Sequence, residues 1–400
     1  MGTEFETALG GSGESESVGR ETARQALRRM ETDEVDFCQV FASPEHDYEP
    51  LLAGIRSVIG DDAVLIGCSS AGELTDGGVE SGGIAIGLVA SDRMRFFASI
   101  ATGLSEDVSS TIRTAVRELP TQVDGFPHLT GITLHDGLVG VGEEIALECQ
   151  RVLGQRIGIA GGSASDDLRM EATHVFGEDK IVEDGIVVVL IASKSPTSIS
   201  LDHGHEPLSE PLEVTDADGP VVNEIDNRPA FDVWRDAIAD HASEHFDIDI
   251  ESADDDMIAD LTTRYEFGID QGGGQYKIRW PGLDVPNRDE GHLRFAVNIP
   301  EGTVLQVTSS SKDDQIECVR RAVDDGLSEM GETDVAGGFV YECACRSAIL
   351  EDRFAEAPAA LADELEKPFA GFQTYGEMCV ERGQMSGHHN TTSVILLLPE

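Results

Sequence analysis

The chain has 400 residues, of which 40% are hydrophobic, and this fits a globular protein of two or three domains with a sizeable core. It carries 76 acidic residues against 28 basic ones, for a formal net charge of −48. We find no basic patch for phosphates, no apolar run near the ~20 residues of a membrane span and no signal peptide. These absences predict a cytoplasmic protein that binds neither nucleic acid nor membrane.

The acidic residues are spread along the chain rather than gathered in one tail. Such a charge repels itself in the compact state unless salt screens it. A basic partner is one interpretation. The interpretation we favour is a surface adapted to high intracellular salt, as in halophilic archaea.

Residues 1–17 are mostly Gly, Ser, Glu and Thr, and we expect them to form a disordered acidic tail. Periodicity and capping residues then predict one domain over residues 18–196 and a second over residues 197–400. In the first, expected helices cover 21–30, 48–59, 105–119 and 142–153, and expected strands cover 35–42, 63–68, 83–90, 94–101, 129–134 and 185–192.

In the second domain, helices are expected at 230–242, 314–330 and 354–365, and strands at 199–208, 336–343, 369–374 and 391–398. The acidic stretch 244–263 is expected to be exposed, and Gly272 to Gly274 to form a hairpin tip. Because hairpins and crossovers are mixed, we predict a mixed α/β fold with sheets layered against helices. The two halves are expected to be pseudo-repeats packed into one compact unit.

Two similar motifs support this duplication. Gly67–Leu74 reads GCSSAGEL and Gly371–Met378 reads GFQTYGEM, so both follow the pattern Gly-x-x-Ser/Thr-x-Gly-Glu. A short apolar run precedes the first copy, which indicates a buried strand ending in a turn. Glycine permits close backbone approach there, and the hydroxyl residue can bond the local backbone.

The remaining glycine-rich and histidine-rich stretches do not indicate a cofactor or a metal. The stretch 157–167 is a second strand followed by a Gly-rich turn, but it matches neither a dinucleotide-binding fingerprint nor a phosphate-binding loop with Lys. His203 and His205 lie two positions apart on an expected strand, so their side chains share one face. His388 and His389 are adjacent in sequence. None of these spacings matches a known zinc pattern. We therefore expect no cofactor and no metal.

Taken in order, these motifs resemble the FIST family. The first half, with GCSSAGE at 67–73, GGSASD at 161–166 and GIVVVL at 185–190, looks like a FIST N domain. The second half looks like a FIST C domain, with HEP at 205–207, CACR at 343–346, GFQTYGE at 371–377 and HHNTT at 388–392. The resemblance implies a sensory module that binds a small molecule, with amino acids or their derivatives as the expected class. Because the chain shows no kinase, chemoreceptor or F-box segment, the resemblance implies a free-standing member that signals through a protein partner.

For an amino-acid ligand, Arg346 would hold the carboxylate, and Glu73 and Glu377 the ammonium group. Serine, threonine, histidine and asparagine side chains and the turn glycines would add hydrogen bonds in a cleft lined by both motif copies. Arg346 can instead form a structural ion pair, and the glutamates can instead fix the turns through backbone N–H groups. The candidate ligand-binding residues are Cys68, Ser69, Ser70, Gly72, Glu73, Gly161, Gly162, Arg346, Thr374, Gly376, Glu377, His389 and Asn390.

Two other classes of function stay open. An enzyme would use Cys68 or Cys345 as a nucleophile, with His135 or His389 as its base. A protein-interaction scaffold would bind no small molecule. The seven cysteines are odd in number and lack CxxC spacing, so we expect no disulfide framework and mostly buried thiols.

Overall fold

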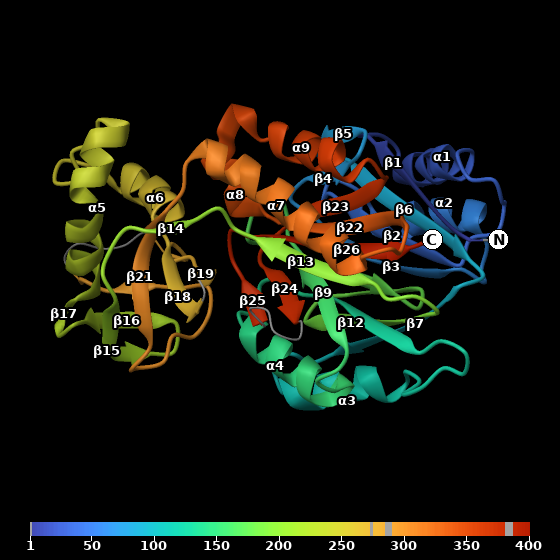
Figure 1. Cartoon of the computed structure of the whole chain (residues 1–400), viewed down its shortest axis with the longest axis horizontal. Helices are drawn as coiled ribbons and strands as arrows, with labels where there is room; N and C mark the ends of the chain where they lie inside the picture. The colour runs from blue at the N-terminus through green and yellow to red at the C-terminus, as the bar shows by residue number, and fades with distance from the viewer. Residues whose placement is uncertain (1, 273–274, 285–289, 381–386) are drawn as a thin grey trace.

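The computed structural model describes residues 2–272, 275–284, 290–380 and 387–400. It shows an α/β body and a smaller lobe at one end, formed by residues 206–309 (Figure 1). The two termini lie close together at the opposite end of the body (Figure 1). The predicted mixed α/β fold is confirmed.

The body consists, within the described residues, of three repeats with the same order of elements: strand, helix, strand, helix, strand, two short strands and a closing strand. Repeat 1 contains β1 (Thr3–Gly10), α1 (Ser15–Leu27), β2 (Phe37–Ala42), α2 (Tyr48–Ile59), β3 (Val64–Ser69), β4 (Glu73–Thr75), β5 (Gly78–Glu80) and β6 (Ile84–Ser91). Repeat 2 contains β7 (Met94–Thr102), α3 (Val108–Arg117), β8 (His128–His135), α4 (Gly142–Leu153), β9 (Gly158–Ser163), β10 (Val175–Gly177), β11 (Lys180–Val182) and β12 (Gly185–Ser193).

Repeat 3 begins with β13 (Ser198–Asp202) and resumes after the lobe. Its remaining elements are α7 (Lys312–Met330), β22 (Val335–Cys343), α8 (Ala344–Leu350), η1 (Glu351–Arg353), α9 (Glu356–Leu365), β23 (Phe369–Thr374), β24 (Glu377–Val380), β25 (Gly387–His389) and β26 (Ser393–Pro399). The first half of the chain thus holds two repeats, and the second half holds the third repeat together with the lobe.

The three sheets of the body exchange their short strands in a cycle. The sheet orders are β1-β6-β2-β3-β10-β11, β7-β12-β8-β9-β24-β25 and β13-β26-β22-β23-β4-β5. Each repeat therefore adds its two short strands to another repeat's sheet. The second and third long strands of every repeat run parallel, as in β8 and β9, where His135 lies opposite Ser163. Because parallel strands end at the same edge, their last residues are brought together.

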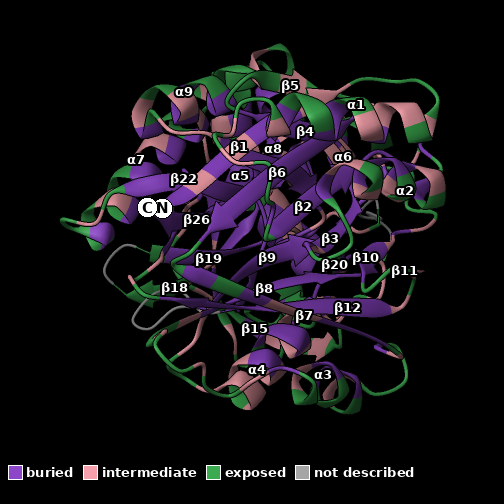
Figure 2. Cartoon of the chain, turned by 90° about the vertical axis from the view of Figure 1, so that its right-hand side faces the viewer, coloured by how far each residue is buried: buried purple, intermediate pink, exposed green. Residues whose placement is uncertain are grey.

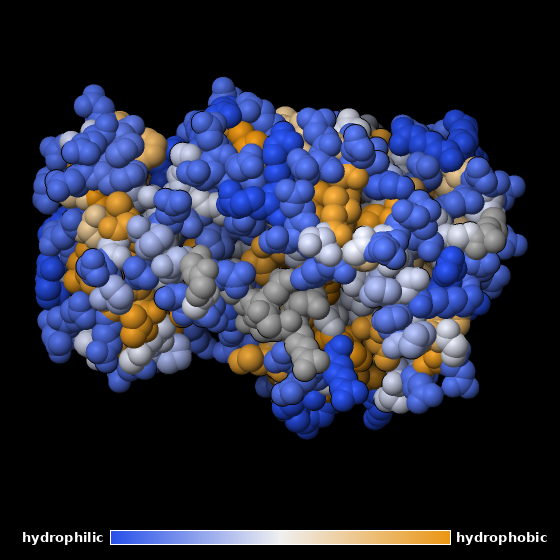
Figure 3. Space-filling view, in the orientation of Figure 1, coloured by the Kyte–Doolittle hydropathy of each residue, from blue (hydrophilic) through white to orange (hydrophobic). Residues whose placement is uncertain are grey.

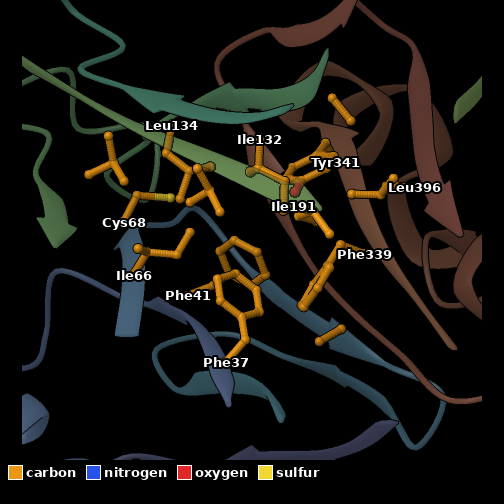
Figure 4. Close-up of a cluster of buried hydrophobic side chains, with 14 of the residues drawn as sticks. Phe37, Phe41, Ile66, Cys68, Ile132, Leu134, Ile191, Phe339, Tyr341 and Leu396 are labelled. Atoms are coloured by element: carbon orange, nitrogen blue, oxygen red, sulfur yellow. The ribbon is translucent and has the colours of Figure 1, made fainter. Parts of the chain in front are cut away.

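One hydrophobic core is shared by all three repeats. Figure 4 shows Phe41 from β2, Ile132 from β8 and Phe339 from β22 in the same cluster. The helices pack against the other face of each sheet, so most strands are buried on both faces (Figure 2). This explains continuous apolar runs such as that of β12, in place of the alternation expected of a half-exposed strand.

The lobe has its own sheet and its own core. Its elements are β14 (Glu206–Pro207), β15 (Leu212–Asp218), β16 (Val221–Ile225), β17 (Arg228–Pro229), α5 (Ala230–Phe246), α6 (Asp255–Arg264), β18 (Phe267–Gly272), β19 (Gln275–Arg279), β20 (Leu293–Arg294) and β21 (Val304–Ser309). Trp234 is fully buried, and its indole N–H donates to the Tyr265 carbonyl at 2.9 Å. The expected hairpin tip falls partly outside the described residues.

The expected exposure of 244–263 is only partly correct. This acidic stretch includes most of α6, whose Asp254 side chain caps the N-terminus by accepting from the Met257 N–H at 3.0 Å. Ile258 and Leu261 point inward and are buried in the lobe core. The carboxylates lie on the outer face of the helix. The acidic composition of the stretch therefore did not indicate its buried apolar face.

The predicted disordered tail is wrong. Residues 3–10 form β1, which pairs antiparallel with β6, and α1 begins at Ser15. Thr3, Phe5 and Thr7 are buried, with Glu4 and Glu6 between them facing outward. This alternation is typical of an edge strand with one buried face.

The surface in Figure 3 is mainly hydrophilic, with small scattered apolar areas. Across the described ranges, none of the helices combines the length and the apolar character needed to span a bilayer.

Candidate functional site

A cavity of about 390 Å³ lies where repeats 2 and 3 meet the lobe. Its lining is largely apolar and includes Leu138, Leu168, Met170, Trp280 and Leu283. Many of its polar lining groups lie at or near the ends of body strands, and these include His135, Ser163, Thr374, His388 and Asn390. The lobe contributes Thr263, Trp280, Leu283 and Ala296, so the cavity has walls from both parts of the molecule.

The topology explains how the polar groups converge. His135 ends β8 and Ser163 ends the parallel strand β9, opposite it in register. The other neighbour of β9 is β24 of repeat 3, which pairs with β25 and so carries His388 to the same sheet edge. Residues separated by more than 200 positions thus meet through sheet pairing.

Ser163 lies between two imidazoles. Its Oγ is 2.9 Å from His135 Nε2 and 3.4 Å from His388 Nε2. A hydroxyl has one proton, so it can donate to one ring while accepting from the other. Burial lowers the pKa of His135 to about 4, against a smaller opposing effect of Asp136. Burial also holds the pKa of His388 well below its usual value, with His135 and Arg279 adding repulsion. Both imidazoles are therefore neutral near pH 7.

These two rings keep unused hydrogen-bonding capacity. Nδ1 of His135 and Nδ1 of His388 are buried and have no partner in the part of the chain that the structure describes. The same holds for Nε1 of Trp280. Buried polar atoms without partners are costly, and all three of these atoms belong to residues that line one cavity, which suits it to a ligand with polar atoms.

Two glycines give His388 its position. A Cβ on Gly376 would lie 2.2 Å from His388 Nε2, and a Cβ on Gly142 would lie 2.3 Å from its Cδ2. Both separations are below any normal contact, so side chains at these positions would displace the ring. The second glycine of the C-terminal motif is therefore needed for close approach of the imidazole.

Charged contacts fasten the lobe to the body beside the cavity. Glu143 at the start of α4 accepts from Lys277 Nζ at 3.0 Å and from Arg279 Nη2 at 2.9 Å. Arg279 Nη1 also donates to the His388 carbonyl at 2.7 Å. The hairpin of β18 and β19 is thereby held against β25, and its position is coupled to that of His388.

The first motif copy does not line this cavity. The Ser70 hydroxyl donates to Glu73, whose other oxygen accepts from the Gly83 N–H at 3.1 Å. Burial raises the pKa of Glu73 to about 8. Ser69 Oγ accepts from the His174 N–H at 2.9 Å. These groups fix a turn, the alternative that the sequence left open for Glu73.

The two motif copies are nevertheless neighbours, because β4 pairs with β23. Gly72 packs against Gln373, where a Cβ would meet the side chain at 3.0 Å. Ala71 and Gln373 line a separate, more open cavity of about 550 Å³. The copies therefore adjoin each other without enclosing the 390 Å³ cavity together.

Arg346 and Glu377 are engaged inside the protein. Arg346 is fully buried, and its guanidinium donates to the carboxylate of Glu342, to Gln315 and to Cys318. It forms the structural ion pair considered above, although with Glu342 and not with a motif glutamate. Glu377 accepts from the Thr374 hydroxyl and from the Thr392 N–H at 3.2 Å. Burial raises its pKa well above the usual range. Because both of its oxygens accept hydrogen bonds from neighbouring residues of the motif and of the following loop, the carboxyl group fixes this turn.

Of the other predicted residues, Thr374 and Asn390 line the cavity, and Gly161 and Gly162 directly precede Ser163. His389 is buried in β25 and does not line it. Cys68 points into the shared core (Figure 4), and burial raises its thiol pKa well above normal, which argues against a thiolate nucleophile there. Cys345 is half-buried and lines the cavity.

The sequence did not indicate Ser163 or Trp280 as site residues. It suggested His388 only as a possible metal ligand and His135 only as a base for a cysteine. A signal was present for Ser163. Residues 160–166 read AGGSASD, which places a hydroxyl residue three positions before an acid, as in the two recognised motif copies. The contact with His388 depends on strand exchange between repeats, which no local pattern reveals.

Across the described ranges, no group of three His, Cys, Asp or Glu side chains is arranged to hold a metal ion. His203 and His205 line another cavity of about 450 Å³, near the link between body and lobe. His205 Nε2 lies 4.0 Å from a carboxylate oxygen of Glu266, and no third ligand completes a site there within those ranges.

Comparison with known proteins gives the family. Residues 36–228 match the FIST N domain and residues 230–380 match the FIST C domain. The chain belongs to the FIST family. FIST domains are sensory domains that bind small ligands in signalling proteins. The resemblance drawn from the motifs is thereby confirmed.

Curated relatives of this FIST chain include archaeal and bacterial proteins that are named only as uncharacterized. One, from Methanocaldococcus jannaschii, is 23% identical over 281 residues, which is 70% of this chain and 52% of the relative. Another, from Mycobacterium tuberculosis, is 24% identical over 241 residues, or 60% of this chain and 61% of the relative. The matched regions thus span between half and three fifths of these relatives.

Among solved structures, a cyanuric acid hydrolase from A. caulinodans aligns over 100% of this chain and 99% of its own, with 9% identity and a TM-score of 0.34. A chorismatase aligns over 99% of both chains, also with 9% identity and a TM-score of 0.34. At these scores the likeness supports no statement about activity.

Proposed function

We propose that this FIST chain is a sensory module that binds a small molecule in the 390 Å³ cavity between the body and the lobe. The observation that carries the proposal is a largely apolar cavity lined by three residues, His135, His388 and Trp280, that each hold a buried polar atom without a partner among the described residues. A pocket that is mostly apolar, with a few directed polar groups, is typical of small-molecule sites.

The charges around the cavity narrow the ligand class. Asp136 is the only carboxylate or cationic side chain, among the described residues, that lines it. Its oxygens are occupied by the Thr173 hydroxyl at 2.5 Å, the Leu138 N–H at 2.9 Å and the Asp184 N–H at 2.6 Å. A zwitterionic amino acid would bury two charges without counter-charges, which is costly. Within the class suggested by the family, we favour an amino-acid derivative whose charges are masked.

Signalling requires that binding change something a partner can read. Because the lobe supplies part of the cavity wall and is linked to His388 through Arg279, a ligand would favour one arrangement of lobe and body. A protein partner that contacts both parts would detect this shift. The partner, the cytoplasmic location and the high-salt environment remain predictions from the sequence.

The test is a thermal-shift screen, in molar KCl, of uncharged metabolites and amino-acid derivatives against wild type and two variants. Ala348 is exposed on α8 and lines the cavity, so Ala348→Trp should fill the space and abolish the shift. Ala359→Trp is a matched control, because Ala359 is also exposed on a helix but lies away from the cavity.

A bound ligand raises the unfolding midpoint by mass action, by about 2.7 kcal/mol of stability at 100 times Kd. We expect hits to be retained in Ala359→Trp and lost in Ala348→Trp. Hits that survive in Ala348→Trp would place the ligand elsewhere. The absence of any hit, followed by capture of a protein partner, would favour the scaffold alternative.

A further inference from the structure

The third strands of the three repeats end in related sequences whose hydroxyl groups have different partners. Ser70, Ser163 and Thr374 each precede an acidic residue by three positions. In repeats 1 and 3 the hydroxyl donates to that acid, as Ser70 does to Glu73 and Thr374 to Glu377.

Repeat 2 departs from this pattern. Its acid is Asp166, which accepts a hydrogen bond from the Tyr375 hydroxyl instead. Asp166 also accepts from the backbone N–H groups of residues 170–172, at distances of 2.7–3.0 Å. The hydroxyl of Ser163 is thereby released from the acid and faces His135 and His388 in the cavity. In repeats 1 and 3 the hydroxyl therefore fixes a turn, whereas in repeat 2 it lies between two imidazoles.

The distances suit proton transfer. His135 Nε2 is 2.9 Å from Ser163 Oγ, within the 2.6–3.2 Å range expected between a general base and the proton it removes. His388 Nε2 is 3.4 Å from the same oxygen. If Oγ attacked a carbonyl group, an N–H at this position could donate to the oxyanion that forms on the carbonyl oxygen. Trp280 also lines the cavity, and its indole N–H has no partner among the described residues.

We propose that Ser163 is a nucleophile and that this cavity cleaves a small, uncharged carboxylic ester, with His135 as the general base. The hydroxyl oxygen of Ser163 bonds to the ester carbonyl carbon while its proton passes to His135 Nε2. The carbon–oxygen bond to the leaving group then breaks, and His135 returns the proton to the departing alcohol. In the second step His135 takes a proton from water, whose oxygen bonds to the acyl carbon. The bond from that carbon to Ser163 Oγ then breaks, and His135 returns the proton to Oγ, which releases the acid and restores the serine.

The surroundings select an ester over other acyl compounds. No charged side chain with free capacity lines the cavity within the described ranges, so a neutral substrate fits best. Nδ1 of His135 has no carboxylate partner there, in contrast to Ser-His-Asp triads, so the base is weak and the leaving group must be a good one. An alkoxide leaves more readily than an amide nitrogen. The inference rests on the proposed function, because it assigns chemistry to the same cavity.

The experiment uses the full chain with a fluorophosphonate probe and with p-nitrophenyl acetate. The probe should form one covalent adduct at Ser163, located by peptide mass spectrometry. Ser163→Ala should abolish the adduct, and both Ser163→Ala and His135→Gln should lower ester turnover by about 100-fold or more. Ser70→Ala is the matched control, since Ser70 has the same motif position but lies outside the cavity, and it should keep both signals.

Circular dichroism and the midpoint of unfolding establish that each variant is folded. Turnover in wild type that persists in Ser163→Ala, or a probe adduct elsewhere, would overturn the assignment of the nucleophile. Screening hits that bind wild type but not Ala348→Trp, combined with no adduct and no turnover, would overturn the inference while leaving the proposed function standing. Failure of both the screen and the probe would overturn both.

Discussion

Replacing Arg346 by methionine should destabilise the body by about 3–5 kcal/mol, the range for removing one partner of a buried ion pair. Methionine keeps most of the volume but none of the donors. The carboxylate of Glu342, which is 3% exposed, would lose its cation inside the protein. Gln315 would lose guanidinium contacts to its side-chain and backbone oxygens, and each unpaired polar group adds to the cost.

A double-mutant cycle isolates the ion pair. We expect Glu342→Gln in the Arg346→Met background to recover a large part of the loss, because the uncompensated buried charge is then removed. Urea unfolding in molar KCl, followed by circular dichroism, measures the free energy of unfolding for all four proteins.

The same variants separate a structural role of Arg346 from a ligand-binding one. Because Arg346 does not line the 390 Å³ cavity, ligands found in the screen should still bind Arg346→Met below its unfolding transition. A variant of near wild-type stability that no longer binds ligand would refute this reasoning.

Four further predictions test other parts of the structure. The raised pKa of Glu73, about 8 against 4.5, means that the folded state holds a proton which the unfolded state has released. Stability should therefore fall as pH rises from about 4.5 to about 8, by at most about 1.4 kcal/mol per pH unit, and Glu73→Gln should show a shallower fall; identical slopes would contradict this. Glu143→Ala removes the carboxylate that joins α4 of the body to Lys277 and Arg279 of the lobe, so limited proteolysis at the lobe–body junction should be faster than in wild type; an unchanged rate would argue against this contact holding the lobe. Cys345 is half-buried and the other six cysteines are buried, so iodoacetamide should modify Cys345 first, and a bound ligand should slow that reaction; labelling that starts elsewhere would be inconsistent with the cavity. The midpoint of unfolding should rise with KCl between 0.1 and 2 M as self-repulsion is screened, and a flat response would weaken the halophilic interpretation.

Many helices and strands could be predicted because they follow from local sequence patterns. The strand expected over 63–68 is β3 at Val64–Ser69, and the helix expected over 314–330 is α7 at Lys312–Met330. Capping and apolar periodicity are local properties, so a single sequence reveals them. β1 was missed because the acidic and small residues around it matched the composition of a disordered segment, although Thr3, Phe5 and Thr7 alternate as a strand does.

The site was less predictable, because it depends on how repeats exchange strands. The motif residues Ser70, Glu73 and Glu377 were recognisable, and the structure uses them to fix turns. The residues that converge on the cavity, Ser163 and His388, are 225 positions apart and meet only through the pairing of β9, β24 and β25. Their sequence signal, the degenerate third motif copy, lacks both glycines and the Glu of the other two, with Ala160, Ser165 and Asp166 in their places.

The most direct test of a ligand site between body and lobe is a crystal structure of this chain with a hit from the thermal-shift screen. We predict ligand density in the 390 Å³ cavity, with a polar ligand atom within hydrogen-bond distance of Nδ1 of His135, Nδ1 of His388 or Nε1 of Trp280. Density in the cavity beside Ala71 and Gln373, or in the one lined by His203 and His205, with the central cavity filled by water alone, would contradict it.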